Sequence, residues 1–89
     1  MDFEYDPKKS ESNIKKHGID FKEGQKLWRD PNGLVFRVQV EGETRYALLA
    51  KCKSKNWSAI FTIRAAKTRI ISIRRSRKKE IILYENGKI

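Results

Sequence analysis

The sequence predicts an α+β fold in one domain over residues 1–89: an antiparallel β-meander, two N-terminal helices packed on one of its faces, and a C-terminal helix. Helix start and stop signals occur twice before residue 30, and alternating apolar and polar residues fill 34–74. Hydrophobic residues make up 38% of the 89 positions, enough for one small core.

The N-terminal part is predicted to contain a short strand and a helix. Residues 3–5 alternate apolar and polar, as in a strand. Asp6 suits the N-cap of a helix, and the proline after it suits the first helical position. The helix is expected over 7–17, with a left-handed C-cap at Gly18. Ile14 is its one strong apolar residue and is expected to anchor it.

A second short helix is predicted after the first. Asp20 and Glu23 form an acidic variant of the capping box that opens a helix. The apolar residues that can pack this segment on a core are Ile19, Phe21, Leu27 and Trp28. The sequence Asp-Pro-Asn-Gly at 30–33 then predicts a turn, because proline presets the backbone angle and Asn-Gly tolerates the left-handed region.

Four strands are predicted next, at residues 34–40, 45–52, 57–64 and 68–74. Since side chains alternate across a strand, the helices should cover a face of the last two strands made by Trp57, Phe61, Ile71 and Ile73. The opposite face should then carry Ser58, Thr62, Arg64, Ser72 and Arg74. A final helix is expected from Arg75 to about Glu85, with Ile81, Ile82 and Tyr84 as its apolar residues.

Composition restricts the class of protein. The net charge of +10 suits a polyanion such as a nucleic acid, or an acidic protein partner. The acidic start and the lack of a long apolar run argue against a signal peptide or a membrane protein, so we expect a cytoplasmic protein. One cysteine, Cys52, and one histidine, His17, do not make an ordinary zinc site, so no metal and no cofactor are expected.

The most informative segment is 64–79, which is rich in cations and contains no acidic residue. We expect Arg64 and Arg74 to converge on one phosphate, because a guanidinium offers a planar fork of donors. Further substrate-binding candidates are Lys51, Lys53, Ser72, Arg77, Lys78 and Lys79. The cations at the start of the final helix oppose its dipole, which suggests an anion bound there. The alternative is that these cations only keep the surface solvated.

His17 is the first candidate for proton transfer, because histidine is the residue type best suited to this near neutral pH. Its place at a helix end leaves a capping role open as the alternative. Glu4 is another candidate base, whereas Asp6 is explained as an N-cap. Trp57 could stack a nucleobase, although its spacing from Phe61 favours a place in the core.

Several motifs resemble the BrnT family of bacterial type II toxins. The matching segments are Phe3-Glu-Tyr-Asp-Pro-Lys-Lys, Asn13-Ile-Lys-Lys-His-Gly-Ile-Asp-Phe-Lys-Glu, Phe61-Thr-Ile-Arg, Arg69-Ile-Ile-Ser-Ile-Arg-Arg-Ser-Arg and the end from Glu80 to Glu85. They occur in the order and at the spacing of the family, whereas 34–56 matches weakly.

The resemblance implies a RelE-like fold and a ribonuclease that halts growth by cutting RNA. It also implies an inhibitory antitoxin, BrnA, with a ribbon-helix-helix part, and a complex that binds operator DNA. By likeness, the catalytic candidates are Arg64, Arg74, Arg75 and His17. The ribosome-directed lysines of RelE have no identifiable counterpart beside Ala65 or Cys52, which leaves the need for a ribosome open.

The leading hypothesis is a metal-independent endoribonuclease in which the RNA 2′-hydroxyl attacks its neighbouring phosphate. The guanidinium groups would stabilise the transition state, and His17 or Glu4 would remove the proton. Two alternatives use the same basic surface: a non-catalytic nucleic-acid-binding module, and a docking domain for an acidic protein partner.

Overall fold

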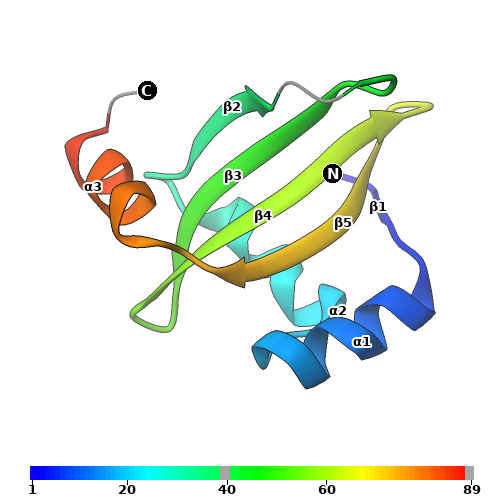
Figure 1. The fold of residues 1–89 in the computed structure, drawn as a ribbon. Coiled ribbons are helices and arrows are strands. Elements are labelled where there is room, and N and C mark those ends of the chain that lie inside the picture. Colours follow the sequence, from blue (N-terminus) through cyan, green and yellow to red (C-terminus); the bar gives the residue numbers. More distant parts are fainter. Residues whose placement is uncertain (39–40, 88–89) are drawn as a thin grey trace.

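The computed structural model describes residues 1–38 and 41–87. A five-stranded sheet forms the centre, in the order β1-β5-β4-β3-β2. Its strands are β1 (Phe3–Glu4), β2 (Leu34–Val38), β3 (Arg45–Cys52), β4 (Lys55–Arg64) and β5 (Lys67–Arg75). The helices are α1 (Pro7–His17), α2 (Phe21–Gly24), the 3-10 helix η1 (Gln25–Arg29) and α3 (Lys78–Asn86). Figure 1 shows α1 and α2 together on one side of the sheet.

The α+β class is confirmed, with three corrections. The sheet is mixed and not a pure meander, because β1 pairs in parallel with β5. The second predicted helix is one short α-helical turn that continues as 3-10 helix. The last strand runs on to Arg75, so the final helix begins at Lys78 instead of Arg75. Of the predicted strand 34–40, Gln39 and Val40 lie outside the described residues.

The first helix has the predicted bounds. The Asp6 carboxylate accepts a hydrogen bond from the backbone N–H of Lys8 at 2.9 Å, and Gly18 closes the helix with a φ of 81°. The predicted anchor was wrong, because Ile14 is 48% exposed. Two buried polar residues, Ser10 and Asn13, attach α1 to the rest of the protein.

Asn13 fixes α1 to the sheet through backbone hydrogen bonds. Its side-chain amide donates to the carbonyls of Ile19 and Ile73, both at 2.8 Å, and its oxygen accepts from the N–H of Ile73 at 3.1 Å. The side chain therefore takes the place of a neighbouring strand along this part of β5. The Ser10 hydroxyl also accepts from the backbone N–H of Phe21, which ties α1 to α2.

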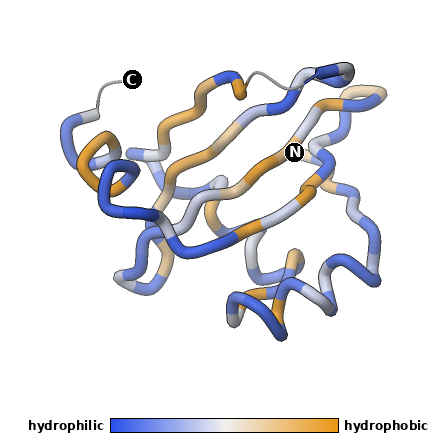
Figure 2. Tube along the Cα trace, in the orientation of Figure 1, coloured by the Kyte–Doolittle hydropathy of each residue, from blue (hydrophilic) through white to orange (hydrophobic). Residues whose placement is uncertain are grey.

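The core lies between the helices and one face of the sheet. Its buried apolar residues are Ile19, Phe21, Leu27, Leu48, Ala50, Trp57, Ala59, Phe61, Ile70 and Ile73. Figure 2 shows this pattern as hydrophobic colour along the strands and hydrophilic colour along most of α1. Trp57, Phe61 and Ile73 lie on the face of the sheet that the helices cover, as predicted.

The prediction that Ile71 joins this face was wrong. The register between β4 and β5 shifts between Ile60 and Phe61, so that Ile60 pairs with Ser72 and Phe61 with Ile70. Ile71 of β5 is unpaired at this bulge, so the alternation of side chains along β5 reverses at that point. Ile70 therefore enters the core in place of Ile71.

Candidate functional site

The predicted convergence of Arg64 and Arg74 on one phosphate is wrong. Arg64 pairs with Lys67 beside the β4–β5 turn, whereas Arg74 pairs with Ser58 near the start of β4. The two positions are therefore about 20 Å apart along the sheet, at about 3.4 Å per residue. The C-terminal ends of two successive antiparallel strands lie at opposite ends of the sheet. One phosphate therefore cannot contact both arginines.

Arg64 is bound to a carboxylate near the far end of the sheet. Its Nε donates to Glu43 at 2.7 Å, and its side chain is 52% exposed. The hydrogen bond from Arg64 lowers the pKa of Glu43, against a smaller opposing effect of desolvation. This pair engages one of the guanidinium donors that were expected to bind a phosphate.

Arg74 is bound more completely, by Glu80 at the start of α3. Its two terminal nitrogens donate to the two carboxylate oxygens, each at 2.8 Å. The hydrogen bond from Arg74 is the main cause that lowers the pKa of Glu80 to about 2, and the backbone N–H of Arg77 adds to it. The Ser58 and Ser76 hydroxyls form a hydrogen bond of 2.8 Å beneath this pair.

The anion expected at the start of the final helix is a side chain of the protein itself. The Glu80 carboxylate accepts from the N–H of Arg77 at 2.7 Å. The side chains of Arg77, Lys78 and Lys79 remain exposed around it. Glu80 thus counters the unfavourable placement of these cations, which the sequence analysis had assigned to a bound phosphate.

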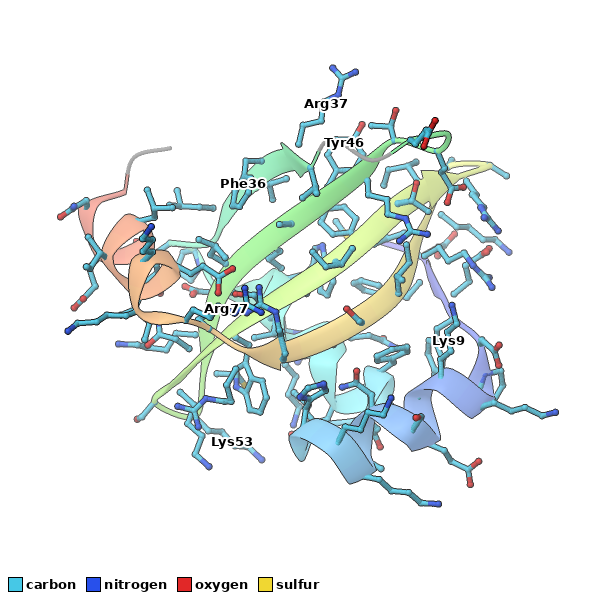
Figure 3. All side chains as sticks on the ribbon, viewed as in Figure 1. Lys9, Phe36, Arg37, Tyr46, Lys53 and Arg77 are labelled. Carbon is cyan, nitrogen blue, oxygen red and sulfur yellow. The ribbon has the colours of Figure 1, made fainter. Side chains whose placement is uncertain are left out.

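A different group of residues converges at the tip of the β3–β4 hairpin, at the lower left of Figure 1. The turn is made by Lys53 and Ser54, with φ values of 51° and 66°, and Lys55 begins the next strand. Lys53 reaches Glu23 of α2 at 3.1 Å. Figure 3 shows Lys53 at this end of the molecule, whereas Arg37 points away from the opposite edge.

Arg75 belongs to the same group. Its guanidinium carbon lies 5.5 Å from the centre of the Trp57 ring, and its Nε donates to the backbone carbonyl of Asn56 at 3.3 Å. Trp57 pairs with Arg75 across the two strands and is only 7% exposed. The guanidinium is therefore held at the surface beside the ring, and its terminal nitrogens have no hydrogen-bond partner among residues 1–38 and 41–87.

The C-terminal end of α1 borders this group. A cavity of about 150 Å³ is lined by Gly18, Ile19, Glu23, Cys52, Lys53, Lys55 and Trp57. His17 directly precedes Gly18 and is exposed. We call the set Lys53, Lys55, Trp57, Arg75 and His17 the hairpin-end site. Of the four predicted catalytic residues, Arg75 contacts Trp57 of the cavity wall and His17 directly precedes Gly18 of that wall, whereas Arg64 lies at the other end of the sheet.

Two remaining substrate-binding candidates lie apart from the cavity wall. Ser72 pairs with Ile60 in the middle of the sheet, on the face opposite to the core helices. Lys51 lies 6.0 Å from the centre of the Tyr84 ring, and the Tyr84 hydroxyl donates to Asp30 at 2.7 Å. Burial and this hydrogen bond raise the pKa of Tyr84 to about 12, so it acts as a neutral donor that holds α3.

The carboxylates were the main omission of the sequence analysis. Glu23, Glu43 and Glu80 each bind a cation that had been considered for substrate. Only Glu80 left a usable signal, because a glutamate at the third helical position is typical of an N-terminal cap. The other two contacts join residues distant in sequence, 23 with 53 and 43 with 64.

Neither a metal centre nor a membrane-spanning helix is present in the part of the chain that the structure describes. In residues 1–38 and 41–87, no three or more His, Cys, Asp or Glu side chains are grouped so that they could hold a metal ion. None of the helices in the same ranges is long and apolar enough to cross a membrane.

These features define the chain as a small basic α+β domain with a group of exposed cations at the hairpin end of its sheet. Comparison with known families identifies the class. The family described as "Ribonuclease toxin, BrnT, of type II toxin-antitoxin system" matches residues 5–80. The chain therefore belongs to the BrnT family, the ribonuclease toxins of type II toxin-antitoxin systems. No curated protein matches it.

Proposed function

We propose that this toxin is a metal-independent endoribonuclease that cuts RNA at the hairpin-end site. The observation that supports this most is the guanidinium of Arg75, which lies 5.5 Å from the centre of the Trp57 ring beside a cavity that Lys53 and Lys55 line. An anchored, charged donor next to a cavity is the arrangement that a phosphoryl transition state requires. Membership in a family of ribonuclease toxins makes RNA the substrate.

The proposed reaction needs no group from outside the RNA except a proton acceptor and donor. The 2′-oxygen forms a bond to the adjacent phosphorus while the bond from phosphorus to the 5′-oxygen breaks. The imidazole of His17 takes the proton of the 2′-hydroxyl, and water supplies a proton to the departing 5′-oxygen. Arg75 stabilises the extra charge on the phosphate oxygens. The products are a 2′,3′-cyclic phosphate and a free 5′-hydroxyl.

The other cations are proposed to hold the RNA backbone around this point. Lys53 and Lys55 flank the cavity, and Arg77, Lys78 and Lys79 extend the basic surface over the start of α3. Arg74 follows the same surface but reaches a phosphate only when Glu80 releases it. Lys51 and Ser72 remain proposed backbone contacts. Arg64, a catalytic candidate by resemblance, is assigned no step in this reaction, and the cleavage rate of Arg64→Ala tests that assignment.

The proposed partners follow from the family. A type II toxin has an antitoxin, and we propose one of the BrnA kind with a ribbon-helix-helix part, whose complex with the toxin binds operator DNA. We also propose that the fold is RelE-like and that the free toxin arrests growth in the cytoplasm by cutting RNA. The two helices on one face of a largely antiparallel sheet support this relationship.

The direct test is incubation of the purified protein with single-stranded RNA in the presence of a chelator. We expect products with cyclic phosphate ends, and no cutting of the same sequence with 2′-deoxyribose throughout. The variant His17→Ala should slow cleavage about 100-fold or more, as expected for loss of a positioned base. As a control for folding, the melting temperature of His17→Ala should equal that of the wild type. Cutting of the deoxyribose strand, or dependence on added metal, would contradict the mechanism.

One observation favours a second function, docking of an acidic protein without catalysis. Arg64 and Arg74 each bind a carboxylate of the chain itself, and an acidic partner would present the same group to the exposed cations Arg75, Arg77 and Lys78. Expression in cells without an antitoxin separates the alternatives. A ribonuclease arrests growth and its His17→Ala variant does not, whereas a docking module or a simple nucleic-acid-binding module gives the same growth with both.

A further inference from the structure

The cavity of about 150 Å³ at the hairpin end has walls that the proposed cleavage does not use. Ile19 and Trp57 are buried to 4% and 7% exposure, and Cys52 is half-buried. These three side chains form an apolar wall with one aromatic ring. The rim is polar, with Glu23, Lys53 and Lys55. An apolar recess with few polar groups at its mouth is typical of a site for a small planar ligand.

The cavity adjoins the proposed phosphate position. Trp57 lines the cavity and also carries the guanidinium of Arg75 at 5.5 Å. A nucleotide whose phosphate contacts Arg75 therefore has its own base, or the next one, within reach of the cavity. Bases bind readily against aromatic side chains in single-stranded nucleic acids, because each base has a π-face. A cavity of this small volume suits a pyrimidine better than a purine.

Glu23 gives the cavity a chemical preference. Lys26 at 2.9 Å and Lys53 at 3.1 Å both contact its Oε1. Within the described part of the chain, Oε2 has no hydrogen-bond partner and stays available as an acceptor. The two lysines lower the pKa of Glu23, which keeps the carboxylate ionised and unable to donate. An ionised carboxylate accepts from the amino group of cytosine and repels the carbonyl that uracil has at the same position.

We infer that this cavity binds one pyrimidine base of the RNA and prefers cytosine to uracil through Glu23. The inference rests on the proposed function, since it uses the phosphate position at Arg75. It adds a specificity-determining residue, Glu23, and a base-binding wall made by Ile19, Cys52 and Trp57.

The test measures binding and not cleavage. Two five-nucleotide RNAs with 2′-O-methyl ribose throughout, one with a central cytosine among uracils and one with uracil only, cannot be cut through their 2′-oxygens. Their dissociation constants are measured by fluorescence anisotropy at one fixed salt concentration. The wild type should bind the cytosine strand about tenfold more tightly, as expected for one hydrogen bond to a charged group.

Two variants decide the role of Glu23. Glu23→Gln should abolish the preference, because an amide also donates to the uracil carbonyl. Glu85→Gln makes the same charge change at an exposed residue of α3, and this variant should still prefer the cytosine strand. Equal binding of the two strands by the wild type, or an unchanged preference in Glu23→Gln, would overturn the inference. If the protein cuts no RNA yet keeps a Glu23-dependent preference, the proposed catalysis fails and the base site stands.

Discussion

At the residue scale, Glu80 controls whether Arg74 is available to a ligand. A carboxylate and a phosphate present similar oxygen pairs to a guanidinium fork, so one excludes the other. In this protein both arginines of the predicted pair contact carboxylates of the same chain, Arg64 through Nε alone and Arg74 through both terminal nitrogens. Arg75 is different, because it contacts an aromatic ring and a backbone carbonyl and has no carboxylate partner among the described residues.

The variant Glu80→Gln tests this relation through stability. It should lower the free energy of unfolding by about 1 to 2 kcal/mol at neutral pH, the value of a charge-assisted pair that solvent partly screens. The pKa of Glu80 is about 2 in the folded protein and 4.5 in the unfolded chain, so the stabilisation is present above pH 4.5. It should vanish as the pH falls through about 2.

Urea unfolding of the wild type and Glu80→Gln at several pH values provides the measurement. Glu85→Gln is the matched control on the same helix. A stability difference that stays constant from neutral pH down to acid would show that the ion pair does not contribute.

The sequence predicts which residues are candidates for the functional site. It does not predict the side chains that these residues contact. The types and order of Arg64, Arg74, Arg75 and His17 are visible in the motifs. Their carboxylate partners are set by the hairpin register and by the path of α3, and neither leaves a local pattern. The expected pocket between Arg64 and Arg74 does not form, because the antiparallel pairing of β4 with β5 places the two residues at opposite ends of the sheet.

At the scale of elements, buried polar side chains attach α1 to the sheet. Asn13 satisfies three backbone groups, two carbonyls and one N–H, in a buried position. A buried backbone group that loses its partner costs more than the net value of one hydrogen bond. This attachment positions the end of α1, and hence His17 and Gly18, against the hairpin.

Asn13→Ala should therefore destabilise the protein by about 2 to 4 kcal/mol, since several buried polar groups lose their partner at once. Ile14→Ala serves as the control on the same helix, because Ile14 is 48% exposed and should change the stability little. Chemical unfolding monitored by circular dichroism gives both values. A larger loss from Ile14→Ala than from Asn13→Ala would contradict the described attachment.

The elements differ in how far local sequence defines them. The bounds of α1 were predictable because Asp6 and Gly18 provide cap chemistry on both sides. The parallel pairing of β1 with β5 and the bulge opposite Ile60 were not, since both depend on contacts between distant segments. For the same reason the periodicity of β5 predicted Ile71, and not Ile70, in the core.

At the scale of the whole molecule, with a net charge of +10, the two ends of the sheet offer different sets of cations to a ligand. The far end of the sheet pairs Arg64 with Glu43 and Arg69 with Glu4. The hairpin end exposes Lys55, Arg75 and Arg77, for which no carboxylate partner is present among the described residues. Polyanion binding should therefore be oriented, with the RNA backbone on the hairpin end.

Salt dependence tests this orientation. Binding of single-stranded RNA should weaken steeply with salt, and Lys55→Gln should reduce the slope of log affinity against log salt by about 0.7, the value for one phosphate contact on a single strand. Arg37→Gln, on the opposite edge, should leave the slope unchanged. Equal changes of slope for the two variants would show that the RNA is bound diffusely over the surface.

The account depends most on the claim that the reacting phosphate lies at Arg75 and not at Arg64. The decisive measurement is the single-turnover cleavage rate of one RNA by Arg75→Ala, Arg64→Ala and the control Arg37→Ala, each confirmed to be folded. Loss of one aimed donor to the transition state predicts a rate about 100-fold lower for Arg75→Ala. Arg64→Ala and Arg37→Ala should cut nearly as fast as the wild type. A large loss in Arg64→Ala with normal cutting by Arg75→Ala would place the chemistry at the other end of the sheet and contradict the account.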